Sequence, residues 1–403
     1  MPAWSNTVAR YAVAVMLAAA PGRAQERVAG TEGTYSSARE RFEHAIILVK
    51  NVFERPLHPV VSGVGPNGGI GAGIGYETPD GDGWRTSARA VYTVHNYWLT
   101  QATVGIQNRR GELAAFGRAR EMGRLDYYGS GPSSSAANRT SYSYRDPAIG
   151  ANGRFRATPW LTVGGRAEHI WPYARAGKRS PSIEQRFFPN DAPGLFLQPR
   201  FGRYQGSIDL RIPGALGDAF YQGTRARTTY AVFEDLTLNS FNFRRLDVEA
   251  QQVFAGLHTY HRLTLSGWMS TTMTNAGQEV PFFLQRTLGG RSEITGMHED
   301  RLGSDGTDAT LRGFRSLRFR DRNLLLLQAE YRFPVWGLIE GTVFGDAGKV
   351  APTRSDLDLT DLQRDFGFSL SVMESWRTMA RVDVAFGSGE RAQVFFSVGR
   401  LTP

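Results

Sequence analysis

The sequence predicts an all-β protein: a transmembrane antiparallel β-barrel of about 16 strands, with a long loop folded into its lumen and a short N-terminal helix. Three observations predict this fold. A signal peptide opens the chain, apolar and polar residues alternate with a period of two over most of the remainder, and aromatic residues stand near the ends of the alternating segments. Such alternation is the pattern of β-strands, and a signal peptide directs a chain out of the cytoplasm.

The first 24 residues have the pattern of a signal peptide. One positive charge in the first ten residues precedes the apolar run Tyr11–Ala20, and the small residues Gly22 and Ala24 follow where a signal peptidase reads. Cleavage is expected after Ala24. The apolar run is shorter than the roughly 20 residues of a membrane-spanning helix, and no later run reaches that length. The exported chain is therefore either soluble or a barrel.

An amphipathic helix is expected before the first strand. Apolar residues recur at helical spacing within residues 36–56, namely at Phe42, Ala45, Ile46, Val49 and Phe53. The helix could lie against the barrel mouth, enter the lumen or rest on the inner membrane surface. We divide the chain into a signal peptide (1–24), an N-terminal periplasmic segment with one helix (25–66) and an outer-membrane β-barrel domain (67–403).

The polar face of the predicted strands distinguishes a barrel from a soluble sandwich. In residues 205–212 and 244–251, arginine and acidic side chains share one face, and aliphatic side chains form the other. Lysine is nearly absent from these segments. A sandwich would present its polar face to bulk water, whereas a barrel lumen brings arginine and carboxylate together in pairs. The pairing favours a barrel whose apolar face meets lipid.

We expect strands near residues 68–78, 84–96, 98–108, 111–122, 140–157, 160–170, 202–212, 222–233, 242–254, 258–272, 323–334, 339–350, 363–373, 376–387 and 391–401. These are fifteen segments, and bacterial barrels have an even number of strands. We therefore predict sixteen, with a second strand hidden in 140–157 or one within 172–200. The gaps 123–139, 172–201 and 273–322 predict long loops. Aromatic girdles are expected from Trp84, Tyr97, Trp98, Trp160, Trp171, Trp268, Trp336 and Trp376.

The C-terminal third carries several motifs in a fixed order: "PFFLQRTLGG" (281–290), "LRGF" (311–314), "LLLLQAEYRFP" (324–334), "GTVFGDAGKV" (341–350) and a closing strand "QVFFSVGRL". Together they resemble the bacterial surface-antigen superfamily of outer-membrane barrels, of the BamA and TamA type. The earlier "YYGSGPSS" (127–134) is similar to a loop of these barrels. The resemblance implies a sixteen-stranded barrel that mediates insertion or translocation of proteins at the outer membrane.

The resemblance also implies a contact in the lumen. In the family, the arginine at the tip of a long loop contacts an acidic residue on the next strand, and an aromatic residue and an aspartate on the strand after it. By motif, the tip consists of Arg312, Gly313 and Phe314, and the partners are Glu330, Phe344 and Asp346. Alternation independently places these three partners on the inward face. Gly313 is expected to permit a tight turn pressed against the barrel wall.

Other arginines of the same loop have no assigned partner. Arg315, Arg318, Arg320 and Arg322 are expected to be loop or rim charges.

The sequence departs from the family pattern in three places. About 45 residues separate Ala24 from the first expected strand, too few for the POTRA domains that receive substrate in the periplasm. Residues 291–310 lengthen the loop before its tip, and the chain ends in Thr402 and Pro403 instead of an aromatic residue. We therefore expect a member of the superfamily that lacks POTRA domains.

No enzymatic activity, cofactor or metal is expected. His258, His261, Ser266 and Asp247 do not form a hydrolase motif. The segments "HED" (298–300) and "DGTD" (305–308) lack a full set of cation ligands. Net charge is +9, but arginine is scattered along the chain, so no nucleic-acid partner is expected.

Two functions remain open for a monomer in the bacterial cell outer membrane. One is assembly or transport of outer-membrane proteins, with outer-membrane lipid and a separate periplasmic protein or unfolded outer-membrane proteins as partners. The other is a pore or structural surface barrel with a plug loop and no insertase activity.

Overall fold

The computed structural model describes residues 55–79, 81–214, 223–255, 261–290, 309–374 and 377–398. All of them belong to the unit Val52–Pro403. The expected signal peptide and the body of the N-terminal helix lie outside the described residues, as do the two loop segments considered for a cation. Among the described residues, no helix combines the length and the apolar character that a membrane span requires.

The described chain is almost entirely β-structure. Its strands are β1 (Leu57–Ser62), β2 (Gly71–Glu77), β3 (Gly83–Thr93), β4 (Trp98–Asn108), β5 (Gly111–Tyr127), β6 (Thr140–Arg145), β7 (Ala148–Thr158), β8 (Leu161–Ile170), β9 (Tyr173–Ala176), β10 (Phe201–Pro213), β11 (Gly223–Asp235), β12 (Phe243–Ala255), β13 (Arg262–Thr274), β14 (Arg286–Leu288), β15 (Phe319–Asp321), β16 (Asn323–Trp336), β17 (Ile339–Ala351), β18 (Gln363–Glu374), β19 (Arg377–Gly387) and β20 (Gln393–Val398). Three short 3-10 helices, η1 (Ala136–Asn138), η2 (Ile183–Gln185) and η3 (Phe282–Leu284), lie in the loops.

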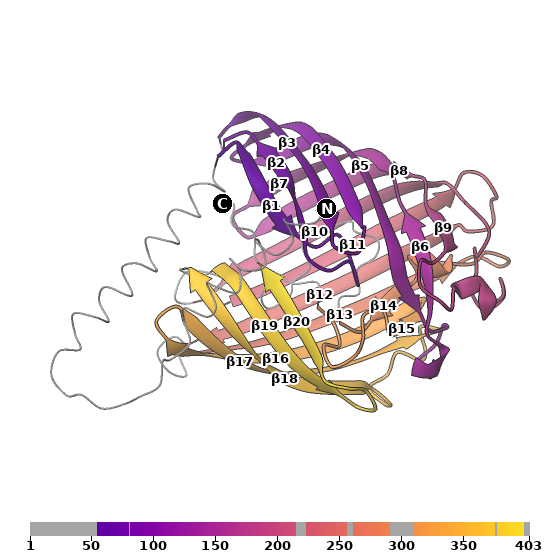
Figure 1. The fold of residues 1–403 in the computed structure, drawn as a ribbon. Helices are drawn as coiled ribbons and strands as arrows, with labels where there is room; N and C mark the ends of the chain where they lie inside the picture. Colours follow the sequence, from indigo (N-terminus) through magenta and orange to yellow (C-terminus); the bar gives the residue numbers. More distant parts are fainter. Residues whose placement is uncertain are drawn as a thin grey trace, which may run out of the picture. The chain divides into compact units, whose positions relative to one another are not determined.

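One antiparallel sheet contains 18 of these strands. Sixteen pair with their neighbours in chain order, from β1 through β5, then β7, β8, β10 to β13 and β16 to β20. Figure 1 shows this order as a gradual change of colour across the sheet. The other two strands, β6 and β9, extend the sheet beside the far half of β5. The predicted count of sixteen wall strands is therefore confirmed within the described residues.

The wall strand missing from the sequence prediction is β1, because the strand considered within 172–200 is β9, which belongs to the extension. β1 pairs with β2 along its whole length, from Leu57 opposite Tyr76 to Ser62 opposite Gly71. The division of the chain at residue 67 stays a prediction, but this part of the sheet begins before it. Residues 140–157 do contain two strands, as considered, but β6 belongs to the extension and only β7 belongs to the wall. β1 has only six residues, directly follows Pro56 and contains Pro59, so its alternation was too weak to be recognised.

The tightest turns of the wall lie at one end and the longest connections at the other. Tight turns join β4 to β5, β7 to β8 and β16 to β17, whereas the connections after β5, β8 and β13 are long and contain the 3-10 helices. In outer-membrane barrels the short turns face the periplasm and the long loops face the exterior. We use the terms short-turn end and long-loop end for these two ends of the wall.

The burial pattern is inverted relative to a soluble protein. In β18 the small and polar residues Asp365, Gly367, Ser369 and Ser371 are buried, whereas Phe366, Phe368 and Leu370 are 65%, 51% and 55% exposed. In β12 the buried residues include Arg245, Asp247, Glu249 and Gln251. Polar side chains thus face the lumen and apolar ones face outward, as a membrane-embedded barrel requires.

The aromatic girdle is confirmed only in part. Trp84, Trp160 and Trp336 are 77%, 49% and 68% exposed and stand at the short-turn end. Tyr97 and Trp268 are wrong assignments, because they are 0% and 4% exposed. The indole nitrogen of Trp268 donates a hydrogen bond to Asp247 in the lumen. Trp376 lies outside the described residues.

Candidate functional site in the barrel lumen

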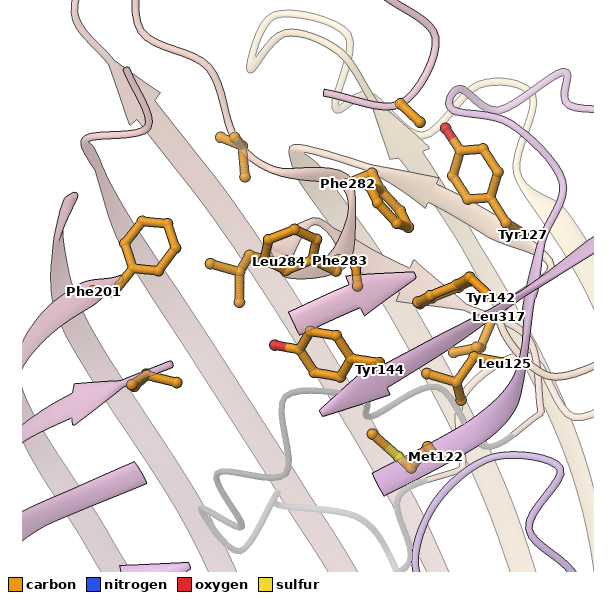
Figure 2. Packing of buried hydrophobic residues seen from close by; sticks show 14 of the residues in the cluster. Met122, Leu125, Tyr127, Tyr142, Tyr144, Phe201, Phe282, Phe283, Leu284 and Leu317 are labelled. Carbon is orange, nitrogen blue, oxygen red and sulfur yellow. The ribbon is translucent and has the colours of Figure 1, made fainter. Parts of the chain in front are cut away.

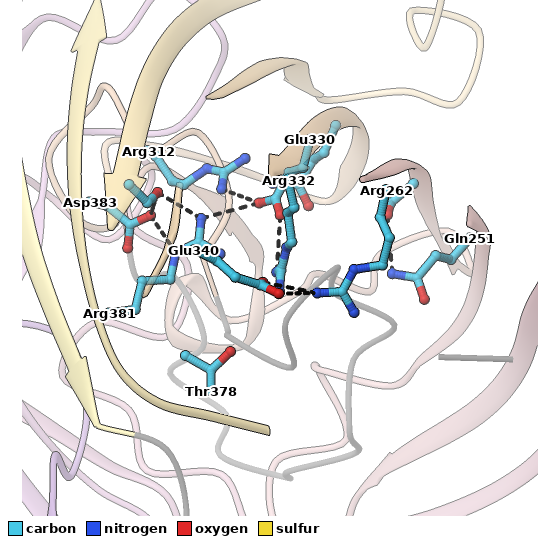
Figure 3. Close-up of polar contacts among 12 residues, drawn as sticks. Gln251, Arg262, Arg312, Glu330, Arg332, Glu340, Thr378, Arg381 and Asp383 are labelled. Carbon is cyan, nitrogen blue, oxygen red and sulfur yellow. Dashed lines mark hydrogen bonds and ion pairs between the residues drawn. The ribbon is translucent and has the colours of Figure 1, made fainter. Parts of the chain in front are cut away.

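The segment that carries Arg312 lies inside the barrel against β16 and β17. The Arg312 side chain is only 3% exposed and donates two parallel hydrogen bonds to Asp346, from Nε at 2.7 Å and from Nη2 at 2.6 Å. Its third nitrogen, Nη1, donates to Glu330 (Figure 3). Since Glu330 lies on β16 and Asp346 on β17, one guanidinium connects the loop to two neighbouring strands of the wall.

An aromatic ring completes this contact. The guanidinium carbon of Arg312 lies 3.5 Å from the ring centroid of Phe344, whose position is opposite Glu330 in the strand register. A guanidinium can use its edge for carboxylates and its face for an aromatic ring at the same time. The three partners expected from the motifs are therefore brought together around Arg312.

The contact belongs to a larger charged network on the wall. Glu330 also receives hydrogen bonds from Arg332 at 3.2 Å and from Arg381 at 3.4 Å. Arg381 in turn bonds Asp383 at 2.7 Å (Figure 3). Buried carboxylates are stable only when such donors surround them, so the network holds the negative charge that Arg312 meets.

Burial and pairing act oppositely on Arg312. Burial lowers the pKa of its guanidinium, but the carboxylates of Asp346 and Glu330 outweigh burial and hold the pKa well above its ordinary value. The residue is therefore a permanent cation in the lumen.

Gly313 and Phe314 have different roles. Gly313 lies in the expected tight turn, where the Phe314 nitrogen donates to the Leu311 carbonyl at 3.2 Å. Its φ is not positive, so the turn itself does not require glycine. The reason for glycine is space: a Cβ on Gly313 would lie 2.4 Å from the backbone nitrogen of Gly387 on β19. Phe314 is 2% exposed and packs edge-on against Phe319, in a cluster with Trp268, Leu288, Leu311, Leu324, Leu326 and Val350.

Two more arginines of this segment are structural, which corrects their assignment as rim charges. Arg318 is 8% exposed and donates to Glu390 at 2.9 Å and to the Ser134 carbonyl at 2.6 Å. Arg320 is 1% exposed, donates to the Phe282 carbonyl and the Tyr142 hydroxyl, and lies within 6 Å of three aromatic rings. Arg315 lies 3.9 Å from Glu390 and is partly exposed.

The "YYGSGPSS" loop packs directly on this segment. The Gly131 backbone nitrogen donates to the Arg320 carbonyl at 2.8 Å, and Ser134 receives Arg318. These contacts join residues almost 190 positions apart, and no spacing in the sequence could have predicted them. The only signal was the occurrence of both motifs in one chain.

A second hydrophobic cluster surrounds η3, in the first part of the long connection between β13 and β16. Phe282, Phe283 and Leu284 of η3 are at most 2% exposed and lie among the aromatic residues Tyr127, Tyr142 and Tyr144 (Figure 2). The ring of Phe282 is 5.3 Å from that of Tyr127 and 5.0 Å from that of Tyr142. The aromatic cluster therefore fixes η3 between the extension strands and the wall.

Solved structures with a similar fold are outer-membrane proteins. The crystal structure of BamA from Haemophilus ducreyi lacking POTRA domains 1-3 superposes with a TM-score of 0.54 at 13% identity, over 96% of this chain and 81% of that one. CdiB from Escherichia coli superposes with a TM-score of 0.56 at 11% identity, over 85% of this chain and 62% of that one, so this chain spans less than two thirds of CdiB.

Comparison with protein-family models gives no match, and comparison with curated protein sequences gives none. Identities this low define the fold only. That fold agrees with the predicted location in the bacterial outer membrane, and the chain has the outer-membrane β-barrel fold of the BamA type.

Proposed function

We propose that this protein takes part in the assembly or transport of proteins at the outer membrane. The observation that supports the proposal is the lumen contact of Arg312 with Glu330, Phe344 and Asp346. It has the residues and the strand positions that the resemblance to the surface-antigen superfamily implies. BamA and CdiB have the same barrel architecture.

The contact would hold the loop in place while the strands of the wall engage a substrate protein. A loop tied to β16 and β17 by a buried ion pair keeps its position unless both carboxylates lose their cation. The ion pairs of Arg312 lie near the C-terminal strands, since the neighbouring Gly313 contacts β19. Movement of these strands and of the loop would therefore be coupled.

Gene deletion and complementation test the proposal. Cells lacking the protein should contain altered amounts of other outer-membrane barrel proteins or of proteins released into the medium. The parent chain should restore both, and Arg312→Ala should restore neither fully. The control is Arg154→Gln, whose exposed pair with Glu112 lies at the short-turn end; it should restore both. Unchanged protein levels in the deletion strain would contradict the proposal.

The alternative function is a plugged pore, and the aromatic cluster around η3 is the observation that favours a plug. Buried rings from β5, β6, β11 and β12 meet η3 at the long-loop end, so a conduit would have to open by moving the loop. The alternative predicts that the purified protein conducts ions in planar bilayers and that removing residues 291–322 enlarges the conductance. Normal levels of other barrel proteins in the deletion strain, together with this conductance, would favour the pore.

A further inference from the structure

Five cationic side chains gather on the outer surface of the extension formed by β5, β6 and β9. We call Arg139, Arg145, Arg175, Lys178 and Arg179 the outer cationic cluster. They surround only two carboxylates, Glu121 and Asp126. Neither the lumen contact nor the proposed function uses these residues.

Three of the cations form ion pairs with Glu121. Its carboxylate lies 2.6 Å from Arg145 Nη2, 3.1 Å from Arg175 Nη2 and 3.5 Å from Lys178 Nζ. The carboxylate side chain is 6% exposed, but the three cationic side chains remain 42% to 45% exposed. Their free faces are therefore directed away from the protein.

The other two cations form ion pairs with Asp126. Arg139 donates to both of its oxygens, at 3.2 Å and 3.0 Å, and Arg179 makes a further ion pair. These arginine side chains are 34% and 37% exposed. Five positive charges against two negative charges leave an excess of three on one surface.

Strand register shows that this surface faces away from the lumen. In β5 the outward side chains include Leu113 and Ala115, and Glu121 has the same parity. Glu121 pairs with Arg145, which pairs with Tyr173, and Arg175 follows Tyr173 on the same face. A bulge between Met122 and Leu125 then turns Asp126 outward as well, since the inward-facing Tyr142 lies opposite Leu125.

The cluster also stands at the height of the membrane surface. Glu121 lies opposite Trp98, the first residue of β4 at the long-loop end, and accepts a hydrogen bond from its indole at 3.3 Å. Tyr173, 41% exposed, lies beside Arg175. Tryptophan and tyrosine mark the level of lipid headgroups, with acyl chains on one side and water on the other.

The backbone positions these cations. The Lys178 backbone nitrogen donates to the Gly123 carbonyl at 2.9 Å. The Lys178 side chain passes directly over Gly123, because a Cβ added to Gly123 would lie 2.9 Å from the Lys178 Cδ. Arg179 follows, with its backbone nitrogen bonded to Ser141. The Lys178 side chain thus crosses the outward face of β5, and the Arg179 side chain is held at Asp126.

We propose that the outer cationic cluster binds the phosphate groups of a phosphorylated lipid in the outer leaflet. Arginine forks bind phosphate through two parallel hydrogen bonds, and basic side chains beside a membrane recognise lipid phosphates. The apolar outer face of β5 below the cluster receives the acyl chains. The inference rests on the membrane location and not on the proposed transport function, so each can fail without the other.

The test uses a variant that preserves the carboxylate pairs. The triple variant Arg175→Gln, Lys178→Gln, Arg179→Gln leaves Arg145 on Glu121 and Arg139 on Asp126. The control variant Arg154→Gln, Arg156→Gln, Arg211→Gln removes three exposed charges at the short-turn end. Heat-modifiable gel mobility should show that both variants fold as the parent does.

Native mass spectrometry of the purified full chain measures binding of diphosphorylated lipid A. Each membrane-proximal cation contributes about fivefold to affinity, so the triple variant should bind about 100-fold more weakly. The control variant should bind as the parent does, and dephosphorylated lipid A should not distinguish the three proteins. Equal affinity of the triple variant and the parent would overturn the inference. Inorganic phosphate binding as tightly as the lipid would overturn the lipid assignment.

Discussion

Two parts of one long connection are fixed to the same barrel by different forces. Residues 282–284 are held by packing, with three apolar side chains buried among tyrosine rings. Residues 311–314 add a charge contact to the packing of Leu311 and Phe314, because Arg312 binds the carboxylates of β16 and β17. Packing energy is spread over many contacts, whereas the charge contact depends on one side chain. The second attachment should therefore fail more completely when a single residue changes.

Arg312→Ala is expected to give the largest effect. It leaves Glu330 and Asp346 buried with one cation fewer, which should lower the free energy of unfolding by about 3–5 kcal/mol. Urea unfolding of the purified protein, followed by gel mobility, measures the loss. The exposed pair Arg154–Glu112 provides the control, because Arg154→Ala should cost at most about 1 kcal/mol.

A double-mutant cycle sharpens this prediction. Asp346→Ala added to Arg312→Ala should cost less than the sum of the two single losses, by about 0.5–3 kcal/mol. Strictly additive losses would mean that the two side chains do not interact in solution.

Phe282→Ala tests the packed half of the connection. Removing a fully buried ring between Tyr127 and Tyr142 should lower stability by about 3 kcal/mol. Phe282→Leu, which keeps most of the apolar volume, should recover more than half of the loss. If leucine were as damaging as alanine, the edge-to-face contacts would matter more than burial, and the contrast between the two halves would weaken.

Gly313→Ala tests the close approach of the loop to β19. A new methyl group 2.4 Å from the Gly387 backbone forces the segment to shift, at a cost of about 1–3 kcal/mol. The matched control is Gly117→Ala, because a Cβ at Gly117 has no atom within 4 Å. Equal stability of the two variants would show that the loop tip does not press on β19.

The smallest effect is expected at Asp358, in the loop after β17. Hydrogen bonds from Lys349 and from Thr360 lower the pKa of its carboxyl to about 2, from an ordinary 3.8. The ion pair therefore stabilises the fold fully above pH 4, and its contribution disappears as pH falls through 2. Because the carboxyl is exposed, Asp358→Asn should leave stability at pH 7 nearly unchanged and make acid unfolding less steep. Acid titration of parent and variant, followed by gel mobility, measures the difference.

The candidate site could be predicted because its parts lie on regular strands. The alternation fixes which residues of β16 and β17 face the lumen, so Glu330, Phe344 and Asp346 were placed inward from parity alone. Their pairing with Arg312 required the motif resemblance, because the loop before Arg312 has no periodicity. The contacts of Arg318 and Arg320 with Ser134, Tyr142 and Phe282 could not be predicted from spacing, since these partners lie far away in the sequence.

The sequence by itself determined the class of this protein and the two faces of its wall. Period-two alternation is a local property, and a side chain's face follows from its position in the strand. Only the tertiary structure decided which loops meet, that Trp268 and Tyr97 are buried and not at the interface, and that five cations collect on the outside of β5, β6 and β9. These features depend on strand register and on bulges such as that at Met122, where one extra residue reverses the face of every side chain that follows.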